Sequence, residues 1–317
     1  MLFYAKYLIR LLYQDRKKIQ GFTLIELLVT ALISGIIVSG LLYLTNELLT
    51  SDQRESTKTE TQRDLNFALD FISAELKQST YIYPNAACLV NGGGAGCTED
   101  GVQLINSNRV DLPNDSGTPV LAFWKQEPLD DDLVQECTGN TPDARIPCIK
   151  GNAYSLVVYS WKEQNADDLG KAAIFRYSMK MTEDSLDNDE YLTPIEAQSF
   201  QYRDWPHENN TAKFSAPELL VDFIDDDNGQ ALICPTADYQ VTPRTGGVDS
   251  FYACVKDVVV NTGPSTTTTT IAGVGNQDVV IRLRGNAKNR SSLMGDESFL
   301  PVLEKQVYIR GVLDLQL

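Results

Sequence analysis

The stretch of sequence that decides the fold runs from Gly21 to Asn46 and reads GFTLIELLVTALISGIIVSGLLYLTN. Its last 20 residues, Leu27–Asn46, carry no charged side chain. A helix of that length spans roughly 30 Å, the thickness of the hydrocarbon core of a bilayer. The chain has no second stretch of this kind, so the sequence predicts a single membrane-spanning helix. A cleaved secretory signal is the rival interpretation, but no A-x-A cleavage pattern follows the apolar run.

Charge is distributed unevenly around this stretch. The first 21 residues contain five basic side chains and one acidic side chain, Asp15, whereas the whole chain of 317 residues has a net charge of −16. A basic head before an apolar helix predicts that the head is cytoplasmic and that the acidic body lies across the membrane. A chain this acidic is a poor candidate for binding nucleic acid.

Composition also narrows the chemistry that the chain can perform. His207 is the sole histidine, which excludes HExxH and Cys2His2 zinc sites. The sequence shows no nucleophile motif and no cluster of metal ligands. We therefore expect a protein that is not an enzyme and that binds no cofactor or metal.

The junction in front of the apolar run is the most specific motif. Residues Gly21-Phe22-Thr23-Leu24-Ile25-Glu26 resemble the processing site of type IV prepilins and type II secretion pseudopilins. The resemblance implies that a prepilin peptidase cuts between Gly21 and Phe22, and that the new amine of Phe22 is then methylated. Glu26 becomes the fifth mature residue, and in this family it pairs with the N-terminal amine of a neighbouring subunit.

The cost of placing Glu26 in a membrane supports that role. A carboxylate costs about 2.5–3.5 kcal/mol at the bilayer centre and less near its edge. An amine from a neighbour would offset this cost as helices assemble. The plainer alternative is a glutamate whose carboxylate reaches the membrane surface.

The helical pattern continues beyond the membrane segment. Residues 47–79 contain no Gly or Pro, and apolar residues recur at helical spacing from Leu65 to Leu76. The run Tyr81–Pro84 is expected to end the helix. We therefore expect a basic leader removed on maturation (1–21), a transmembrane or filament-core helix (22–49), an amphipathic helix continuing into the globular domain (50–84) and a β-rich extracytoplasmic domain (85–317).

The remainder of the chain is predicted to be mostly β-structure. Runs rich in Val, Ile, Tyr and Phe alternate with loops rich in Asp, Asn, Pro and Thr, and helical patterns are scarce. The expected fold is α+β and pilin-like, with one long N-terminal helix packed on an antiparallel β-sheet with long, disulfide-stapled loops. Predicted strands are Ser155–Trp161, Ala173–Met181, Leu219–Ile224, Phe251–Val260, Val279–Arg284 and Gln306–Leu315.

All of the cysteines follow the apolar helix. An even number of cysteines beyond a membrane anchor indicates an oxidising compartment. Six cysteines allow 15 pairings, and proximity favours 88–97, 137–148 and 234–254. A zinc site is the alternative, but no CxxC pair is present. The cysteines are Cys88, Cys97, Cys137, Cys148, Cys234 and Cys254.

Two other features are ambiguous. Two acidic runs, Asp225–Gly229 and Asp184–Glu190, lack the ligand series of an EF-hand. Solvated turns therefore explain them better than calcium sites do. Trp124, Trp161 and Trp205 are candidates for a sugar-binding surface, but core packing explains them better.

The resemblance suggests a function within the family. The size of the chain and the segment LNFALDFISAELKQSTYIYP at 65–84 resemble the larger minor subunits, the J-type pseudopilins and W-type minor pilins, and in particular the cyanobacterial pseudopilins of hormogonium polysaccharide secretion. This implies a minor subunit that helps to initiate or cap a short filament in secretion or motility. Its partners would be other pilins or pseudopilins, the peptidase, an inner-membrane assembly platform and membrane lipid. A tip-displayed adhesin and a minor pseudopilin of a type II protein secretion system are the alternatives.

Overall fold

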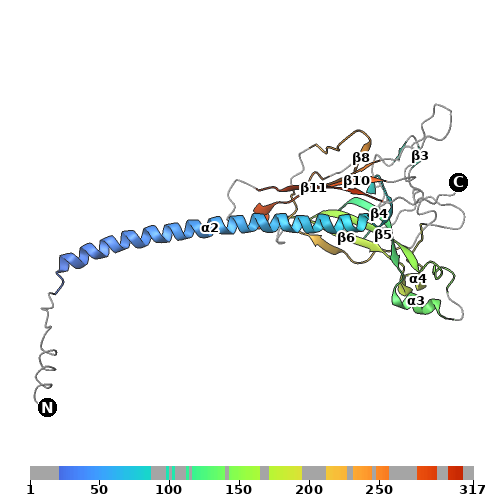
Figure 1. The fold of residues 1–317 in the computed structure, drawn as a ribbon, viewed down its shortest axis with the longest axis horizontal. Helices are drawn as coiled ribbons and strands as arrows, with labels where there is room; N and C mark the ends of the chain where they lie inside the picture. The colour runs from blue at the N-terminus through green and yellow to red at the C-terminus, as the bar shows by residue number, and fades with distance from the viewer. Residues whose placement is uncertain are drawn as a thin grey trace, which may run out of the picture. The chain divides into compact units, whose positions relative to one another are not determined.

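The structure is a computed structural model, and Figure 1 shows the order of its helices and strands. The chain divides into two compact units, one up to Gln53 and one from Arg54 onward, which is called the globular unit below. The structure describes residues 21–86, 98–99, 102–103, 112–113, 116–139, 143–164, 171–194, 212–226, 231–244, 248–256, 277–290 and 299–309.

The described residues form four helical segments and eleven strands. The helical elements are α2 (Leu24–Leu76), α3 (Asp131–Cys137), α4 (Glu183–Asp187) and the 3-10 helix η3 (Ala287–Arg290). The strands are β1 (Ser79–Ile82), β2 (Thr98–Glu99), β3 (Val102–Gln103), β4 (Thr118–Pro128), β5 (Asn152–Glu163), β6 (Ala172–Met179), β7 (Glu218–Val221), β8 (Tyr239–Thr242), β9 (Phe251–Lys256), β10 (Asp278–Arg284) and β11 (Val302–Tyr308). This is the α+β, pilin-like architecture that the sequence predicts.

Helix α2 is shorter at its end than the sequence predicted. The sequence predicted that the run Tyr81–Pro84, at the end of the segment 50–84, stops the helix. Helix α2 stops earlier, at Leu76, because residues 79–82 form strand β1. The Ser79 hydroxyl donates a hydrogen bond to the Leu76 carbonyl at 2.6 Å, which satisfies one of the last helical carbonyls. The β-branched and aromatic residues that follow favour a strand.

The larger sheet has the order β1-β4-β5-β6-β7, and its neighbouring strands are antiparallel. Side chains alternate between the two faces of this sheet along each strand, and each face packs against a hydrophobic core. On β4 and β5, Phe123 and Val157 belong to the core that includes α2. Their neighbours Trp124 and Leu156 belong to a second core, which also contains Leu133 of α3.

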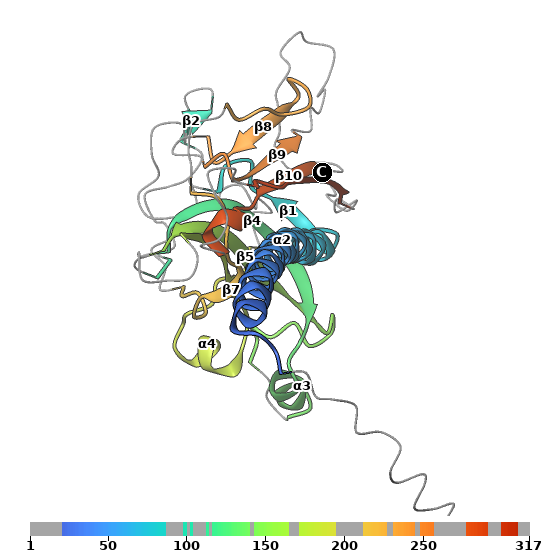
Figure 2. The same ribbon diagram turned by 90° about the vertical axis from the view of Figure 1, so that its left-hand side faces the viewer.

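The four-stranded sheet, called the smaller sheet below, has the order β11-β10-β9-β8 and is also antiparallel. Strands β2 and β3 form a separate two-stranded sheet. Its inner residues, such as Ala253 and Ile281, join the same core as α2. Its outer residues, such as Tyr252, form a small cluster with the Cys234–Cys254 disulfide. The part of α2 from Arg54 onward therefore contributes to a core shared by both sheets, and Figure 2 shows that part beside them.

The predicted apolar stripe of α2 is the one that packs. Leu65, Leu69, Ile72 and Leu76 are buried, as expected from their spacing. Gly285, just after β10, lies against this stripe: a Cβ atom there would be 2.9 Å from a methyl carbon of Leu65. The absence of a side chain at Gly285 lets the helix approach the strand closely.

Ion pairs add to this packing. Asp64 on α2 accepts a hydrogen bond from Arg290 Nη2 at 2.6 Å, and Asp70 pairs with Lys305 of β11. The Arg290 guanidinium also lies 4.3 Å from the ring centre of Phe223. The smaller sheet and η3 thus bind α2 through charges as well as through the core.

Five predicted strands overlap β5, β6, β7, β9 and β10. The last predicted strand, Gln306–Leu315, overlaps β11 but was wrong at its start. Strand β11 begins at Val302, four residues before the predicted start, and β11 ends at Tyr308. Its Glu304 and Lys305 hid the alternating pattern, because these residues are uncommon in strands. Strand β4 was missed entirely, because its Pro119 and Pro128 resemble turn residues. Residues 257–260 and 310–317 lie outside the described residues.

Candidate processing and assembly site

The processing motif lies at the start of α2: Gly21, Phe22 and Thr23 precede the helix, and its first turn contains Glu26. Thr23 stands before the helix, and its carbonyl accepts hydrogen bonds from the amides of Glu26 (3.1 Å) and Leu27 (3.2 Å). The Thr23 hydroxyl is 3.4 Å from the Glu26 amide, a weak N-cap contact. Thr23 and Glu26 thus have the spacing of a capping box, so Glu26 stabilises the positive end of the helix even in an isolated subunit.

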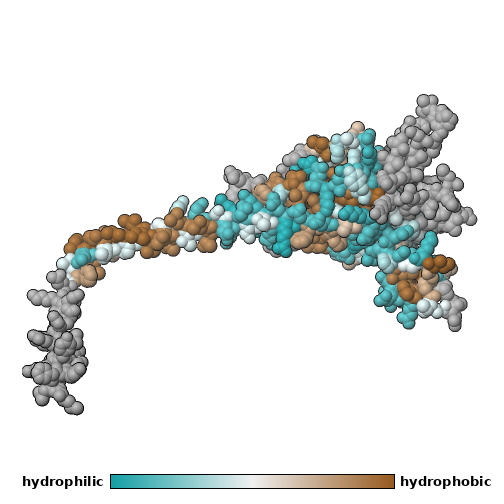
Figure 3. Space-filling model, in the orientation of Figure 1, coloured by the Kyte–Doolittle hydropathy of each residue, from teal (hydrophilic) through white to brown (hydrophobic). Residues whose placement is uncertain are grey.

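The segment that follows exposes its apolar side chains. Every described residue from Gly21 to Leu49 is exposed, including Phe22 at 73% and Leu24 at 83%. α2 is the one helix among the described residues that is long and apolar enough to cross a membrane. Figure 3 shows the apolar residues along this part of the helix. Such a surface is unstable in water and needs cover from lipid or from other helices.

The serine and threonine hydroxyls in this segment donate hydrogen bonds within the helix. The hydroxyl of Ser34 donates to the Thr30 carbonyl at 2.6 Å, and that of Ser39 donates to the Gly35 carbonyl at 2.8 Å. Thr45 donates in the same way to Leu41, at 2.8 Å. These internal bonds leave few unsatisfied donors in an apolar environment. They fit a helix that resides in a membrane or a bundle of helices.

Two glycines leave room for close helix contact. A Cβ atom added at Gly35 or Gly40 would meet nothing within 4 Å. Small residues at such positions allow a second helix to approach the backbone.

The comparisons with known proteins bear on this segment. Residues 16–42 match the family model described as the prokaryotic N-terminal methylation motif. The match indicates a pilin or pseudopilin processed by a prepilin peptidase. No curated protein and no solved structure matches the chain. The matched residues contain Gly21, Phe22 and Glu26, so the motif coincides with the start of α2 seen in the structure.

Two of the expected disulfides are present in the structure. Cys137 pairs with Cys148, and Cys234 pairs with Cys254, as sequence proximity favoured. The first joins the end of α3 to the loop before β5, and the second joins a loop to β9. The proposed pair Cys88–Cys97 lies outside the described residues.

The described residues of the first acidic run, Asp225 and Asp226, form contacts with other side chains of the protein. Asp225 is 1% exposed and accepts hydrogen bonds from Arg284 Nε at 2.7 Å and from Asn286 Nδ2 at 2.9 Å. Asp226 pairs with Lys171 at 3.3 Å. The prediction of a solvated turn is therefore wrong for Asp225, which is a buried ion-pair partner. Residues 227–229 lie outside the described residues.

The second acidic run also forms protein contacts. Asp189 pairs with Arg145 at 2.8 Å, and Glu190 pairs with Lys213. Among the described residues, no three Asp, Glu, His or Cys side chains are grouped in a way that could hold a metal ion.

The tryptophans that the structure describes are in the core. Trp124 is fully buried, and its indole donates to the Tyr83 hydroxyl at 2.9 Å. Trp161 is 8% exposed. Neither forms part of an exposed sugar-binding surface. Trp205 and His207 lie outside the described residues.

Sequence reasoning missed a charged cluster inside the globular unit. Glu75 of α2 is buried against the larger sheet, where its carboxylate contacts Lys125 at 2.6 Å and Arg176 at 2.9 Å. Tyr159 donates a hydrogen bond to the same carboxylate. Burial alone would raise the pKa of Glu75, but the hydrogen bonds from Arg176, Lys125 and Tyr159 lower it below its ordinary value. The sequence signal that could have revealed the burial of Glu75 is its position next to Leu76, on the apolar stripe of the helix.

Proposed function

We propose that the chain is a minor pilin or pseudopilin subunit. It helps to initiate or cap a short pilus-like filament that serves secretion, with polysaccharide the favoured cargo, or motility. The N-terminus is made by a prepilin peptidase, which cuts after Gly21, and it carries an N-methyl group on Phe22. It acts as a structural subunit and not as an enzyme.

The observation that carries this proposal is the exposed apolar helix that starts at the processing motif. No described residue from Leu24 to Leu49 is buried by the rest of the chain. The hydrophobic surface of the segment is therefore available for lipid before assembly and for neighbouring helices afterwards. Glu26 lies in the first turn, where an amine from a neighbour would meet it.

The localisation follows from the same features. Before assembly, the subunit is anchored in the inner, cytoplasmic membrane with its leader in the cytoplasm. Its globular unit lies in the periplasm or outside the cell. The basic leader and the disulfides in the globular unit support this orientation.

Photo-crosslinking in native membranes tests the proposal. A photo-reactive residue in place of Ile33, which is 53% exposed on the apolar segment, should capture other pilins or pseudopilins. The same residue in place of Ile149, which is fully exposed on the globular unit, is the matched control and should capture far less of them. If the Ile33 probe captured only lipid while export and motility were intact, the filament role would be contradicted. Capture of type II secretion pseudopilins would instead assign the subunit to protein secretion.

A further inference from the structure

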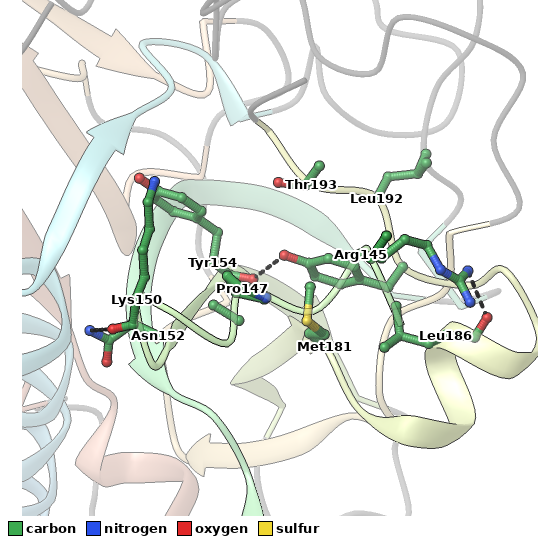
Figure 4. A pocket seen from close by; sticks show the side chains of 12 residues that line it. Arg145, Pro147, Lys150, Asn152, Tyr154, Met181, Leu186, Leu192 and Thr193 are labelled. Carbon is green, nitrogen blue, oxygen red and sulfur yellow. Dashed lines mark hydrogen bonds between the residues drawn. The ribbon is translucent and has the colours of Figure 1, made fainter. Parts of the chain in front are cut away.

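A hollow of about 600 Å³ opens on the globular unit between the loop before β5 and the loop after α4. Figure 4 shows Lys150, Asn152 and Tyr154 on one side of it and Arg145 and Leu186 on the other. A packing defect holds one or a few waters, whereas ligand sites typically have volumes of about 300–1,000 Å³. The hollow therefore has the size of a ligand site.

The lining of the hollow is amphipathic. Its inner part contains buried apolar side chains, including Ala153, Met181 and Leu186. Its outer part contains exposed polar groups, those of Lys150 and Asn152. The ammonium group of Lys150 has no ion-pair partner in the part of the chain that the structure describes. An apolar floor with a few polar groups around it is the usual composition of a small-molecule site.

The walls are held in place by several cross-links. The Cys137–Cys148 disulfide fixes one end of the loop before β5. Arg145 Nη1 donates to the Leu186 carbonyl at 2.9 Å and so joins that loop to α4. The Tyr191 hydroxyl donates to the Tyr154 carbonyl at 2.8 Å. These contacts preorganise the hollow, which lowers the entropic cost of binding a ligand.

A further fixed point lies at the start of α4. The side chains of Thr182 and Ser185 form a reciprocal capping box there. This box holds the helix that carries Leu186, one of the floor residues. The ordered floor is a second reason why a ligand would meet a rigid surface.

The charges select among ligand classes. The Arg145 guanidinium is already paired with Asp143 at 2.7 Å and with Asp189 at 2.8 Å, so its charge is compensated. Among the described residues that line the hollow, only Lys150 adds a charge without an ion-pair partner, which is weak for an anion site. The rings of Tyr154 and Tyr191 instead offer aromatic surface, and the C–H face of a sugar ring packs well on such rings. Its hydroxyl groups match the amide of Asn152 and the ammonium of Lys150.

We propose that this hollow is a binding site for a neutral saccharide. The inference does not depend on filament assembly, since every lining residue belongs to the globular unit. It places the site on tyrosines and not on the tryptophans considered from the sequence.

Binding of defined oligosaccharides to the full chain tests the proposal. The protein is purified in an amine-oxide detergent, because the head group of a maltoside is itself a saccharide. Ligand-observed NMR and calorimetry then measure binding of maltohexaose, cellohexaose and a galacturonic acid hexamer. We expect one neutral hexamer to bind, and the anionic hexamer to bind no more tightly.

Two variants locate the site. Ala144 is exposed and lines the hollow, so Ala144→Trp fills it without disturbing the core. This change should weaken binding at least tenfold, and Tyr154→Ala should do the same. Ile149→Trp places the same ring on a fully exposed neighbouring residue that does not line the hollow, and it should leave binding unchanged. Unchanged thermal midpoints would show that each variant is folded.

Other results would contradict the proposed ligand class or the proposed location of the site. If neither neutral hexamer bound, or if only the anionic hexamer bound, the proposed ligand class would be wrong. If a neutral hexamer bound equally well to Ala144→Trp and wild type, the site would lie elsewhere on the protein. Crosslinking through Ile33 is unaffected by these outcomes, so the filament role stands or falls separately.

Discussion

Arg176 donates two hydrogen bonds to the carboxylate of Glu75, from Nε at 3.1 Å and from Nη2 at 2.9 Å. Glu75 lies on α2 and Arg176 on β6, so this bidentate pair joins the helix to the larger sheet. Both side chains are largely buried, and Lys125 approaches the same carboxylate. The pair fixes the position of the helix along the sheet, because a shift of one residue would bury unpaired charges.

The first prediction concerns Glu75. Glu75→Ala leaves Arg176 and Lys125 buried without their carboxylate, so we expect a loss of about 3–5 kcal/mol in the free energy of unfolding. Glu60 lies on the same helix, and its side chain is 61% exposed in a 3.3 Å pair with Arg290. Glu60→Ala should cost less than about 1 kcal/mol. Denaturant unfolding measures both, and equal losses would show that the cluster does not hold the helix.

A pH dependence follows for the same residue. Because the folded pKa of Glu75 is lowered, its contribution to stability is present at neutral pH. This contribution is lost as the pH falls below the ordinary range of a carboxyl group and through the lowered pKa. The difference in stability between wild type and Glu75→Gln should therefore shrink as the pH falls through the lowered pKa of Glu75. A difference that stayed constant with pH would contradict the assignment.

The second prediction separates a backbone collision from backbone strain. Gly117 has φ +76°, and a Cβ atom there would lie 2.2 Å from the Trp161 carbonyl oxygen. Gly151 has φ +66° but open space around it. Gly151→Ala should cost about 1–2 kcal/mol from its left-handed backbone. Gly117→Ala should cost clearly more, because a strand must also move. Similar thermal midpoints for the two variants would argue against the close approach of Gly117 to β5.

The third prediction concerns the disulfides. Non-reducing peptide mapping of protein from its native compartment should recover 137–148 and 234–254. Replacing Cys137 and Cys148 together by Ser should lower the free energy of unfolding by roughly 3 kcal/mol, as loop closure predicts. Free thiols at these positions, or different partners, would contradict the structure. Mapping would also decide whether Cys88 pairs with Cys97, which stays a prediction.

Sequence patterns predicted the features that depend on local periodicity. The stripe from Leu65 to Leu76 is a 3.6-residue repeat, and it is the buried face of α2. The uncharged run Leu27–Asn46 was equally plain, since composition alone marks it.

Features that depend on distant partners were not predictable. Glu75 reads as one more charged helix residue until β4 and β6 bring Lys125 and Arg176 against it. Asp225 reads as a turn residue until Arg284 reaches it from a strand 59 residues later. The hollow likewise forms where the loop before β5 meets the loop after α4, and these loops are far apart in the sequence. Such contacts are set by tertiary packing and leave no periodic signal.

The fourth prediction distinguishes two roles of Glu26. If Glu26 only caps the helix, Glu26→Gln should preserve function, because glutamine serves the capping box equally well. If its charge pairs with the amine of a neighbour, Glu26→Gln and Glu26→Ala should both recruit fewer subunits. Membrane insertion, cutting and disulfides should survive in both variants. Crosslinking yield through Ile33 is the readout, and we expect a partial loss. Full recruitment by Glu26→Gln would reduce Glu26 to a capping residue.

The most direct test of the central claim is the mass of the mature N-terminus. Mass spectrometry of the protein from native membranes should find a chain that begins at Phe22 with an N-methyl group. Gly21→Val should prevent the cut, because we expect a side chain at that position to fill the tight site of the peptidase. Gly35→Ala, which adds a methyl group in open space, should not prevent it. A mature protein that began at Met1, or at a site beyond Asn46, would contradict the account.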